Sequence, residues 1–236
     1  MPVVFVTATG TDIGKTYVSL GLIAHWRGGG RKVAALKPVA SGFDPAAAAN
    51  SDSALLLGSL GRDVDAASLD EISPWRFVAP LSPDMAARRE NRHIDFADLV
   101  ARCRASMAAS DDILLIEGIG GLMVPLDSRA TVLDLIAELA VPMLLVAGTY
   151  LGTLSHVLTA CAAARQRGVE IRALVLNQSP DCAIPIAETE ATLTQFCAPV
   201  PIISLARGET AENRARFARL AALCEAPASI SSGSVI

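Results

Sequence analysis

Short, uninterrupted apolar runs alternate with helix-like segments along the whole chain, and this alternation is the strongest constraint on its fold. Strands are predicted at 3–6, 32–36, 112–117, 142–146, 171–176 and 200–203. Helices are predicted at 15–27, 53–58, 95–109, 131–140, 153–167, 186–196 and 211–224. Strands that are apolar on both faces are typical of parallel sheets covered by helices on both sides. The chain is therefore predicted to be an α/β protein with a mostly parallel, doubly wound sheet.

The length of the chain and its irregular segments suggest how it is divided. A chain of 236 residues fits one α/β domain, which we expect over residues 1–224. Residues 225–236 are Ser-rich and are expected to form a flexible tail. Residues 59–92 hold three prolines and little periodicity, so they are predicted to be functional loops with one edge element.

Composition excludes several classes of function. The formal net charge is −4, without the basic face that nucleic-acid binding requires. No apolar run reaches the ~18 residues of a membrane span, and the first residues lack a basic leader. The five cysteines include no Cys-x-x-Cys pair, which argues against a zinc site or a disulfide framework. Two of them, Cys161 and Cys197, are expected to be buried thiols, and the expected location is the reducing cytoplasm.

A phosphate-binding loop is predicted at residues 8–16, between the first strand and the first helix. Gly14 lets the backbone approach phosphates, and the amides at the start of the helix face the anion. Lys15 supplies a positive charge to the outer phosphates, and the Thr16 hydroxyl is a hard oxygen ligand for Mg²⁺. The usual first glycine, five positions before Gly14, is Thr9 here. The context of strand, Gly-Lys-Thr and helix still indicates a P-loop NTPase fold, whereas the spacing does not fit a dinucleotide fingerprint.

Lysine is rare in this chain, and its positions are informative. Lys15, Lys32 and Lys37 are the three lysines among 20 basic residues. Codon bias accounts for the scarcity, but not for the places where lysine is kept. Lys37 directly follows the second predicted strand, and the carboxyl ends of parallel strands line the ligand crevice. Lys37 is therefore expected to face the same crevice as Lys15, while Lys32, at the opposite end of its strand, has no predicted role.

Two acidic residues are candidates for the same crevice. Glu117 ends a buried strand and is followed by Gly-Ile-Gly-Gly, so its carboxylate would lie beside the phosphate loop if the strands are neighbours. It would then suit Mg²⁺ or its water shell, and Gly120 and Gly121 permit close backbone approach to an anion. Asp52 lies in an Asn-Ser-Asp-Ser stretch, where a helix N-cap supplied by Ser51, Asp52 or Ser53 is the better interpretation from the local sequence alone.

Together these segments resemble the dethiobiotin synthetase family, over roughly residues 3–200. The resemblance rests on Thr-Ala-Thr-Gly-Thr-Asp-Ile-Gly-Lys-Thr at 7–16 and on the more specific Lys-Pro-Val-Ala-Ser-Gly at 37–42. Further matches are Asn-Ser-Asp at 50–52, Ser-Pro at 82–83, Glu-Gly-Ile-Gly-Gly at 117–121, Leu-Gly-Thr-Leu-Ser-His at 151–156 and Val-Leu-Asn at 175–177. The resemblance adds most to the case for Asp52 as a site residue, which is weak from the local sequence alone.

The resemblance implies a role for each matching residue. Nucleotide phosphates would be held by Asp12, Ile13, Gly14, Lys15, Thr16 and Tyr17, and adenine would be contacted by Asn177. Mg²⁺ would be arranged by Thr16, Asp52 and Glu117. Lys37 would be the catalytic lysine, assisted by Lys15, with Gly118, Ile119 and Gly120 against the reacting groups. Substrate would be contacted by Thr11, Ser41 and Gly120, and by Leu151 and Gly152 from the other subunit of a homodimer.

The activity implied by the family is ATP- and Mg²⁺-dependent closure of a cyclic urea. 7,8-diaminopelargonate would react with CO₂ to give a carbamate, then a carbamic-phosphoric anhydride, and finally dethiobiotin, ADP and phosphate. Three positions depart from the family pattern: Ala8 replaces a glycine, Tyr150 a basic residue and Ser155 an asparagine. The segment at 200–205 lacks a clear base-binding motif, which leaves the preference for ATP over other triphosphates open.

Two other functions compete with this interpretation. A partitioning-type ATPase, a switch that acts through protein partners, usually carries a lysine four residues before the glycine of Gly-Lys-Thr, where this chain has Gly10. A related amide-forming synthase usually carries a glutaminase domain, for which 236 residues leave no room. The Lys-Pro-Val-Ala-Ser-Gly stretch also favours the synthetase.

Overall fold

The main sheet in the computed structural model of the chain is parallel throughout. The structure describes residues 1–180, 184–208 and 210–227, so Cys182 and most of the expected tail lie outside the described residues. The six strands run in the order β2-β5-β1-β6-β7-β8. Their bounds are β1 Val3–Ala8, β2 Val33–Leu36, β5 Ile113–Glu117, β6 Met143–Ala147, β7 Ile171–Asn177 and β8 Ile202–Leu205. The predicted doubly wound α/β fold is confirmed.

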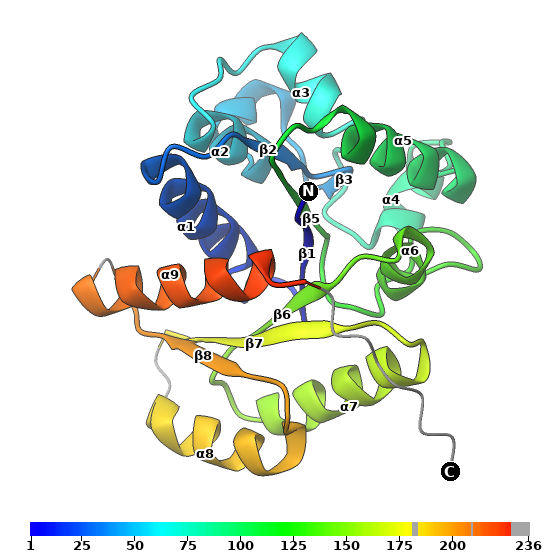
Figure 1. Cartoon of the computed structure of the whole chain (residues 1–236). Helices are drawn as coiled ribbons and strands as arrows, with labels where there is room; N and C mark the ends of the chain where they lie inside the picture. The colour runs from blue at the N-terminus through cyan, green and yellow to red at the C-terminus, as the bar shows by residue number, and fades with distance from the viewer. Residues whose placement is uncertain (181–183, 209, 228–236) are drawn as a thin grey trace.

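Helices cover both faces of this sheet (Figure 1) because successive strand side chains point to opposite sides. Val4 and Val6 of β1 pack under one layer of helices, and Phe5 packs under the other. The first layer contains α1 Lys15–Gly28, α2 Asp52–Ser59, α3 Ala66–Ile72 and α9 Ala211–Glu225. The second contains α5 Phe96–Ala109, α6 Val132–Leu139, α7 Thr153–Gln166 and α8 Ile186–Cys197.

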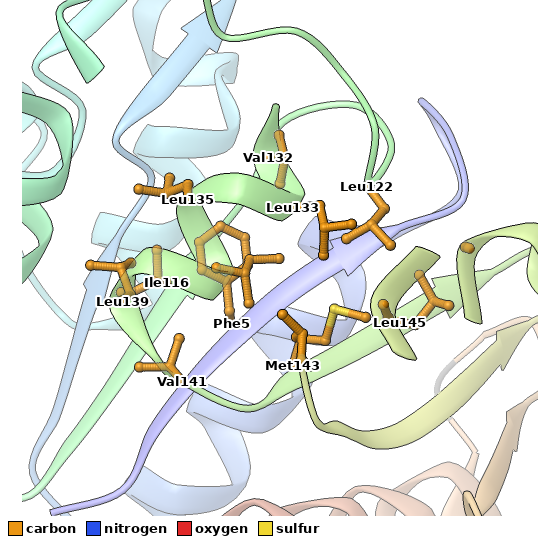
Figure 2. Close-up of a cluster of buried hydrophobic side chains, with 14 of the residues drawn as sticks. Phe5, Ile116, Leu122, Val132, Leu133, Leu135, Leu139, Val141, Met143 and Leu145 are labelled. Atoms are coloured by element: carbon orange, nitrogen blue, oxygen red, sulfur yellow. The ribbon is translucent and has the colours of Figure 1, made fainter. Parts of the chain in front are cut away.

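The core beneath α6 fixes the segment that follows β5. Figure 2 shows Phe5, Ile116 and Met143 from three neighbouring strands packed with apolar side chains of α6. Each fully buried Leu or Ile there contributes about 1.5–3 kcal/mol. A capping box starts the helix: the Asp134 carboxylate accepts from the Thr131 amide at 2.8 Å. The loop between β5 and α6 is therefore anchored at both ends.

Residues 59–92 are more regular than expected. They contain the helix α3, the strand β4 Trp75–Phe77 and the helix α4 Pro83–Arg89. The prediction of loops was wrong for the two helices, while the strand of this segment, β4, pairs in parallel with β3 Val39–Ser41 in a separate two-stranded sheet. Strands of three residues are too short to give a periodic signal. A 3-10 helix, η1 Pro45–Asn50, connects β3 to α2.

Three smaller observations bear on the predictions. The last strand begins at Ile202 rather than at residue 200, since Pro201 has no N–H to give to a ladder. Cys161 and Cys197 are buried free thiols, as predicted. Within the described ranges, no helix combines the length and apolar character that a membrane crossing requires.

Candidate active site

A cavity of about 810 Å³ opens at the carboxyl ends of β1, β2 and β5. The phosphate loop, the β3–η1 segment, the loop after β4 and the loop after β5 form its walls. The predicted site residues that line it are Thr11, Asp12, Gly14, Lys15, Thr16, Lys37, Ser41, Asp52, Ile119 and Gly120. The strand order explains why segments that are distant in the sequence meet here, since β1 lies beside β5 and β5 beside β2.

The phosphate loop is held in shape by two neighbours. Gly14 is the N-cap of α1 with φ of 100°, a left-handed conformation that favours glycine. A Cβ at Gly14 would also lie 2.2 Å from Asn177 Nδ2, an amide that donates to the Ile13 carbonyl at 2.9 Å. On the other side, a Cβ at Gly121 would lie 3.1 Å from the Thr9 carbonyl oxygen. Gly14 is thus required by its backbone conformation and by the Asn177 side chain, and Gly121 by the close approach of the Thr9 backbone.

Lys15 is a buried cation near the bottom of the cavity. Its Nζ donates to the Gly10 carbonyl at 3.1 Å. Burial, and then repulsion from the Lys37 ammonium, lower the pKa of Lys15 to about 8, although Glu117 and Asp52 oppose the change. An anionic ligand beside Lys15 would favour its charged form.

Lys37, Asp52, Glu117 and Thr16 form one ionic cluster at the edge of the sheet. Lys37 Nζ lies 2.7 Å from Glu117 Oε1 and 3.0 Å from Asp52 Oδ2. The Thr16 hydroxyl donates to Glu117 Oε1 at 3.0 Å. The Lys37 and Glu117 side chains are 5% and 0% exposed, whereas Asp52 is 49% exposed. Lys37 and Glu117 were each predicted to face this crevice; the structure brings both there, and their side chains are in direct contact.

The charges in this cluster stabilise one another. Burial alone would lower the pKa of Lys37, but the two carboxylates outweigh burial and raise its pKa above the usual value. Burial alone would raise the pKa of Asp52, but the Lys37 ammonium, helped by Thr16 and Lys15, holds it below the usual range. Lys37 therefore stays cationic and Asp52 stays anionic near neutral pH.

Local structure explains why Asp52 is free to join the cluster. The Ser51 side chain accepts from the Ala54 amide at 3.2 Å and is the N-cap of α2. Asp52 is the first residue of the helix, where its carboxylate also complements the helix dipole. This resolves the ambiguity left by the sequence, since Ser51 is the cap and Asp52 faces Lys37.

The donors in the cluster fit a divalent cation of the Mg²⁺ type. Among the described residues, Glu117 Oε2 is a buried carboxylate oxygen with no hydrogen-bond partner. Two carboxylates and the Thr16 hydroxyl are hard oxygen donors, and Mg²⁺ characteristically takes one or two carboxylates, completing its shell with phosphates and water. The part of the chain that the structure describes has no group of three or more His, Cys, Asp or Glu side chains able to hold a metal.

Several predicted residues do not line the cavity. The residues predicted for the site that are not among those lining it are Ile13, Tyr17, Glu117, Gly118, Asn177, Leu151 and Gly152. The Tyr17 hydroxyl donates to the Gly208 carbonyl at 3.3 Å, so its side chain points toward α9. Leu151 is 92% exposed.

Tyr150, which departs from the family pattern, contacts a residue of α7 and a residue of the phosphate loop. Its hydroxyl lies 2.8 Å from His156 Nδ1 and 3.5 Å from Thr9 Oγ1. The side chain therefore links the start of α7 to the phosphate loop.

The sequence did not indicate the apolar part of the cavity. Its apolar lining residues include Phe43, Pro80, Leu81 and Val124. They come from three separate segments, two of them around the unpredicted β3–β4 pair. Only Ser82-Pro83, which also lines the cavity, gave a signal in this region.

Comparisons with known proteins point to a single activity. A family model described as AAA domain matches residues 3–207. The ATP-dependent dethiobiotin synthetase of Acidiphilium cryptum is 48% identical over 198 residues, which are 84% of this chain and 89% of that protein. The enzyme of the same name from Methylobacterium nodulans is 45% identical, over 88% of this chain and 94% of its own. That from Pseudomonas aeruginosa is 36% identical, over 83% and 85%.

Solved structures of lower similarity share the fold. The cell division ATPase MinD of Pyrococcus furiosus superimposes with a TM-score of 0.54 at 17% identity, covering 95% of this chain and 99% of that one. The signal recognition particle receptor FtsY of Elizabethkingia anophelis gives 0.51 at 16% identity, covering 93% and 65%. These likenesses show the fold alone, which is that of the P-loop NTPases.

Proposed function

Because the chain belongs to the ATP-dependent dethiobiotin synthetase family, we propose that it joins CO₂ to 7,8-diaminopelargonate and closes the cyclic urea of dethiobiotin. It is an ATP-dependent ligase of biotin synthesis. The observation that best supports the reaction proposed here is the buried ion cluster of Lys37, Asp52 and Glu117. Lys37 and Asp52 line the same cavity as the phosphate loop and an apolar wall, and Glu117 is buried directly behind them.

The proposed chemistry has three steps. One amine of the substrate takes up CO₂ and releases a proton to form a carbamate, whose oxygen attacks the γ-phosphorus of ATP with departure of ADP. The second amine then attacks the carbonyl carbon of the resulting carbamic-phosphoric anhydride, losing a proton and expelling phosphate. Two anions must meet in the phosphoryl transfer, and Lys37 and Lys15 would stabilise the charge that develops between them.

The phosphate loop would bind the nucleotide through its backbone. The proposed contacts run from Asp12 to Tyr17, and Tyr17 would contribute only its amide because its side chain points toward α9. Asn177 would reach the base from beside Ile13, whose carbonyl it already contacts.

Thr16, Asp52 and Glu117 would hold Mg²⁺. When bound there, Mg²⁺ would neutralise charge on the phosphates. This assignment is supported by the buried, unpartnered Glu117 Oε2 among the described residues.

The diamino acid would occupy the rest of the cavity. Thr11, Ser41 and Gly120 line it and would contact the amines and the carbamate. Ile119 also lines it, and Gly118, next to it in the chain, would lie close to the reacting groups. The apolar side chains of Phe43, Leu81 and Val124 suit a hydrocarbon chain.

We propose a homodimer in which Leu151 and Gly152 receive the carboxylate tail of substrate bound to the partner subunit. This part of the proposal rests on the resemblance to the family, and Leu151, at 92% exposed, is accessible to a partner. As part of the same proposal, residues 1–224 act as one domain. The buried free thiols favour a reducing cytoplasm.

The decisive test is ADP release in the presence of the diamine and bicarbonate, and then with each omitted. A synthetase should release ADP only when both are present. Release that does not depend on the diamine would favour the partitioning-type switch instead.

A conservative substitution tests the role of Lys37 in this reaction. Lys37→Arg keeps the charge but replaces a compact ammonium by a planar guanidinium. We expect ATP binding to change little and turnover to fall by about 10²-fold or more. ATP affinity by calorimetry and steady-state turnover would be compared, and normal turnover would remove Lys37 from the catalytic assignment.

A further inference from the structure

Lys37 lies where a divalent cation would bind. Its Nζ is 2.7 Å from Glu117 Oε1 and 3.0 Å from Asp52 Oδ2. Thr16 donates its hydroxyl to the same Glu117 oxygen at 3.0 Å. These three side chains are the oxygen donors assigned above to the metal, so one set of ligands faces two different cations.

The two cations cannot share these oxygens in close contact. Glu117 is fully buried, and a buried carboxylate needs a positive partner. One ammonium contacts two carboxylates, while Lys15 acts on them only at longer range, and a divalent ion would neutralise both carboxylates directly. An ammonium held within about 4 Å of that ion would be strongly repelled in a buried site.

We propose that Lys37 is the resident counter-ion of the metal site and has two positions. In the nucleotide-free enzyme its ammonium rests between Asp52 and Glu117, which is its resting position. When a divalent cation enters with the nucleotide, the ammonium leaves and turns into the adjoining cavity, which is its working position. This rests on the proposed function, because the working position matters only if a carbamate forms in the cavity.

The burial of the side chain favours such an exchange over simple release to solvent. Lys37 is 5% exposed, and both Lys37 and Ser41 line the cavity. The space available to the displaced ammonium is therefore the substrate side of the same cavity. The charge needed for phosphoryl transfer would be delivered only after metal and nucleotide have bound, so binding order and catalysis would be coupled through one side chain.

Mn²⁺ binding to the nucleotide-free protein, followed by electron paramagnetic resonance, tests the resting position. Lys37→Gln removes the competing ammonium, and we expect it to bind Mn²⁺ at least about tenfold more tightly than the wild type. Lys15→Gln is the matched control, because it removes a buried cation of the same cavity that contacts Gly10 rather than the carboxylates. It should tighten binding by less than about threefold, and the exposed Lys32→Gln should have no effect.

Equal or weaker Mn²⁺ binding by folded Lys37→Gln would overturn the proposal. Equal tightening by Lys15→Gln would also overturn it, because a general field effect would then explain both. Diamine-dependent ADP release by the wild type is measured separately, so a failure of the proposed function is distinguishable from a failure of the cation exchange.

The working position has its own readout in the unmodified enzyme. With three lysines in the whole chain, selective ¹³C labelling of lysine side chains gives three assignable sets of NMR signals. On addition of Mg²⁺ and ADP, the Lys37 signals should shift and the Lys32 signals should not. A Lys37 signal that stays in place while Mg²⁺ and ADP bind would overturn the exchange, whether or not any variant folds.

Discussion

The strands β2 and β5 carry opposite charges at both of their ends, and the two ends behave differently. At the amino end, Arg31 pairs with Asp112 and Lys32 faces Asp111. At the carboxyl end, Lys37 pairs with Glu117. In both places the cation flanks β2 and the carboxylate belongs to β5 or its flank, so the same pairing is made twice along one pair of strands.

The two ends of the strand pair differ in how deeply their charged side chains are buried and in what they contact. The Lys37 and Glu117 side chains are 5% and 0% exposed, whereas Lys32 and Asp111 are 81% and 79% exposed. The amino end fastens β2 and β5 to α9 through Glu225, which also contacts Arg31. The carboxyl end lies beside the phosphate loop and its charges are held out of water. An exposed ion pair contributes little and is satisfied by solvent, while a buried one must be matched and can respond to an incoming ligand.

The largest effect is expected at the buried end. Glu117→Gln removes a proposed metal ligand and one partner of Lys37, while Asp52 still faces the ammonium. Turnover should fall by at least about 10²-fold, with the fold retained. Steady-state ADP release and circular dichroism would be measured together, and turnover within about threefold of the wild type would contradict the assignment.

At the exposed end we expect stability to fall while turnover is unchanged. Arg31→Ala breaks contacts to both Asp112 and Glu225, which join β2, β5 and α9. The midpoint of thermal unfolding should fall measurably, while turnover at a temperature well below that midpoint should equal that of the wild type. Comparing this variant with Glu117→Gln separates the two ends. A loss of turnover without a loss of stability in Arg31→Ala would remove the distinction.

A smaller effect of pH should also appear at the exposed end. The Arg31 guanidinium holds the pKa of Asp112 below its usual value in the folded protein. The pair therefore stabilises the fold above the unfolded pKa, near 3.9, and this is lost as the pH falls through the lower folded pKa. The urea midpoints of the wild type and Asp112→Asn should differ by a constant amount from pH 5 to 8 and converge below about pH 4. An equal difference at pH 3 and pH 7 would contradict this account.

Sequence reasoning succeeded where topology decides the outcome. The six buried runs identified the strands of the main sheet, and the rule that parallel carboxyl ends meet at one edge brought Lys37 and Glu117 to the same crevice. It did not predict their direct contact, because side-chain distance depends on how β2 and β5 are paired. In the structure Leu36 lies opposite Ile116, which places the next residue of each strand side by side.

Other parts of the site carried no local signal. Asp52 could not be separated from its capping neighbours, since serine and aspartate cap helices equally well and only packing selects Ser51. The apolar wall of Phe43, Leu81 and Val124 depends on the β3–β4 pair, whose three-residue strands have no periodicity to detect. The sequence therefore indicates the charged half of the cavity better than the apolar half.

The smallest effect is expected for Lys32→Gln, and it tests whether position or residue type makes a lysine important. Lys32 Nζ lies 3.8 Å from Asp111 Oδ2 with both side chains largely in water, so the pair contributes little. Its backbone amide, which donates to Asp112 at 3.0 Å, is unchanged by the substitution. The unfolding midpoint should stay within about 1 °C of the wild type, and turnover should be unchanged. A fall in turnover of several-fold would show that the amino end of β2 affects the chemistry at its carboxyl end, because this substitution leaves every contact of the buried cluster in place.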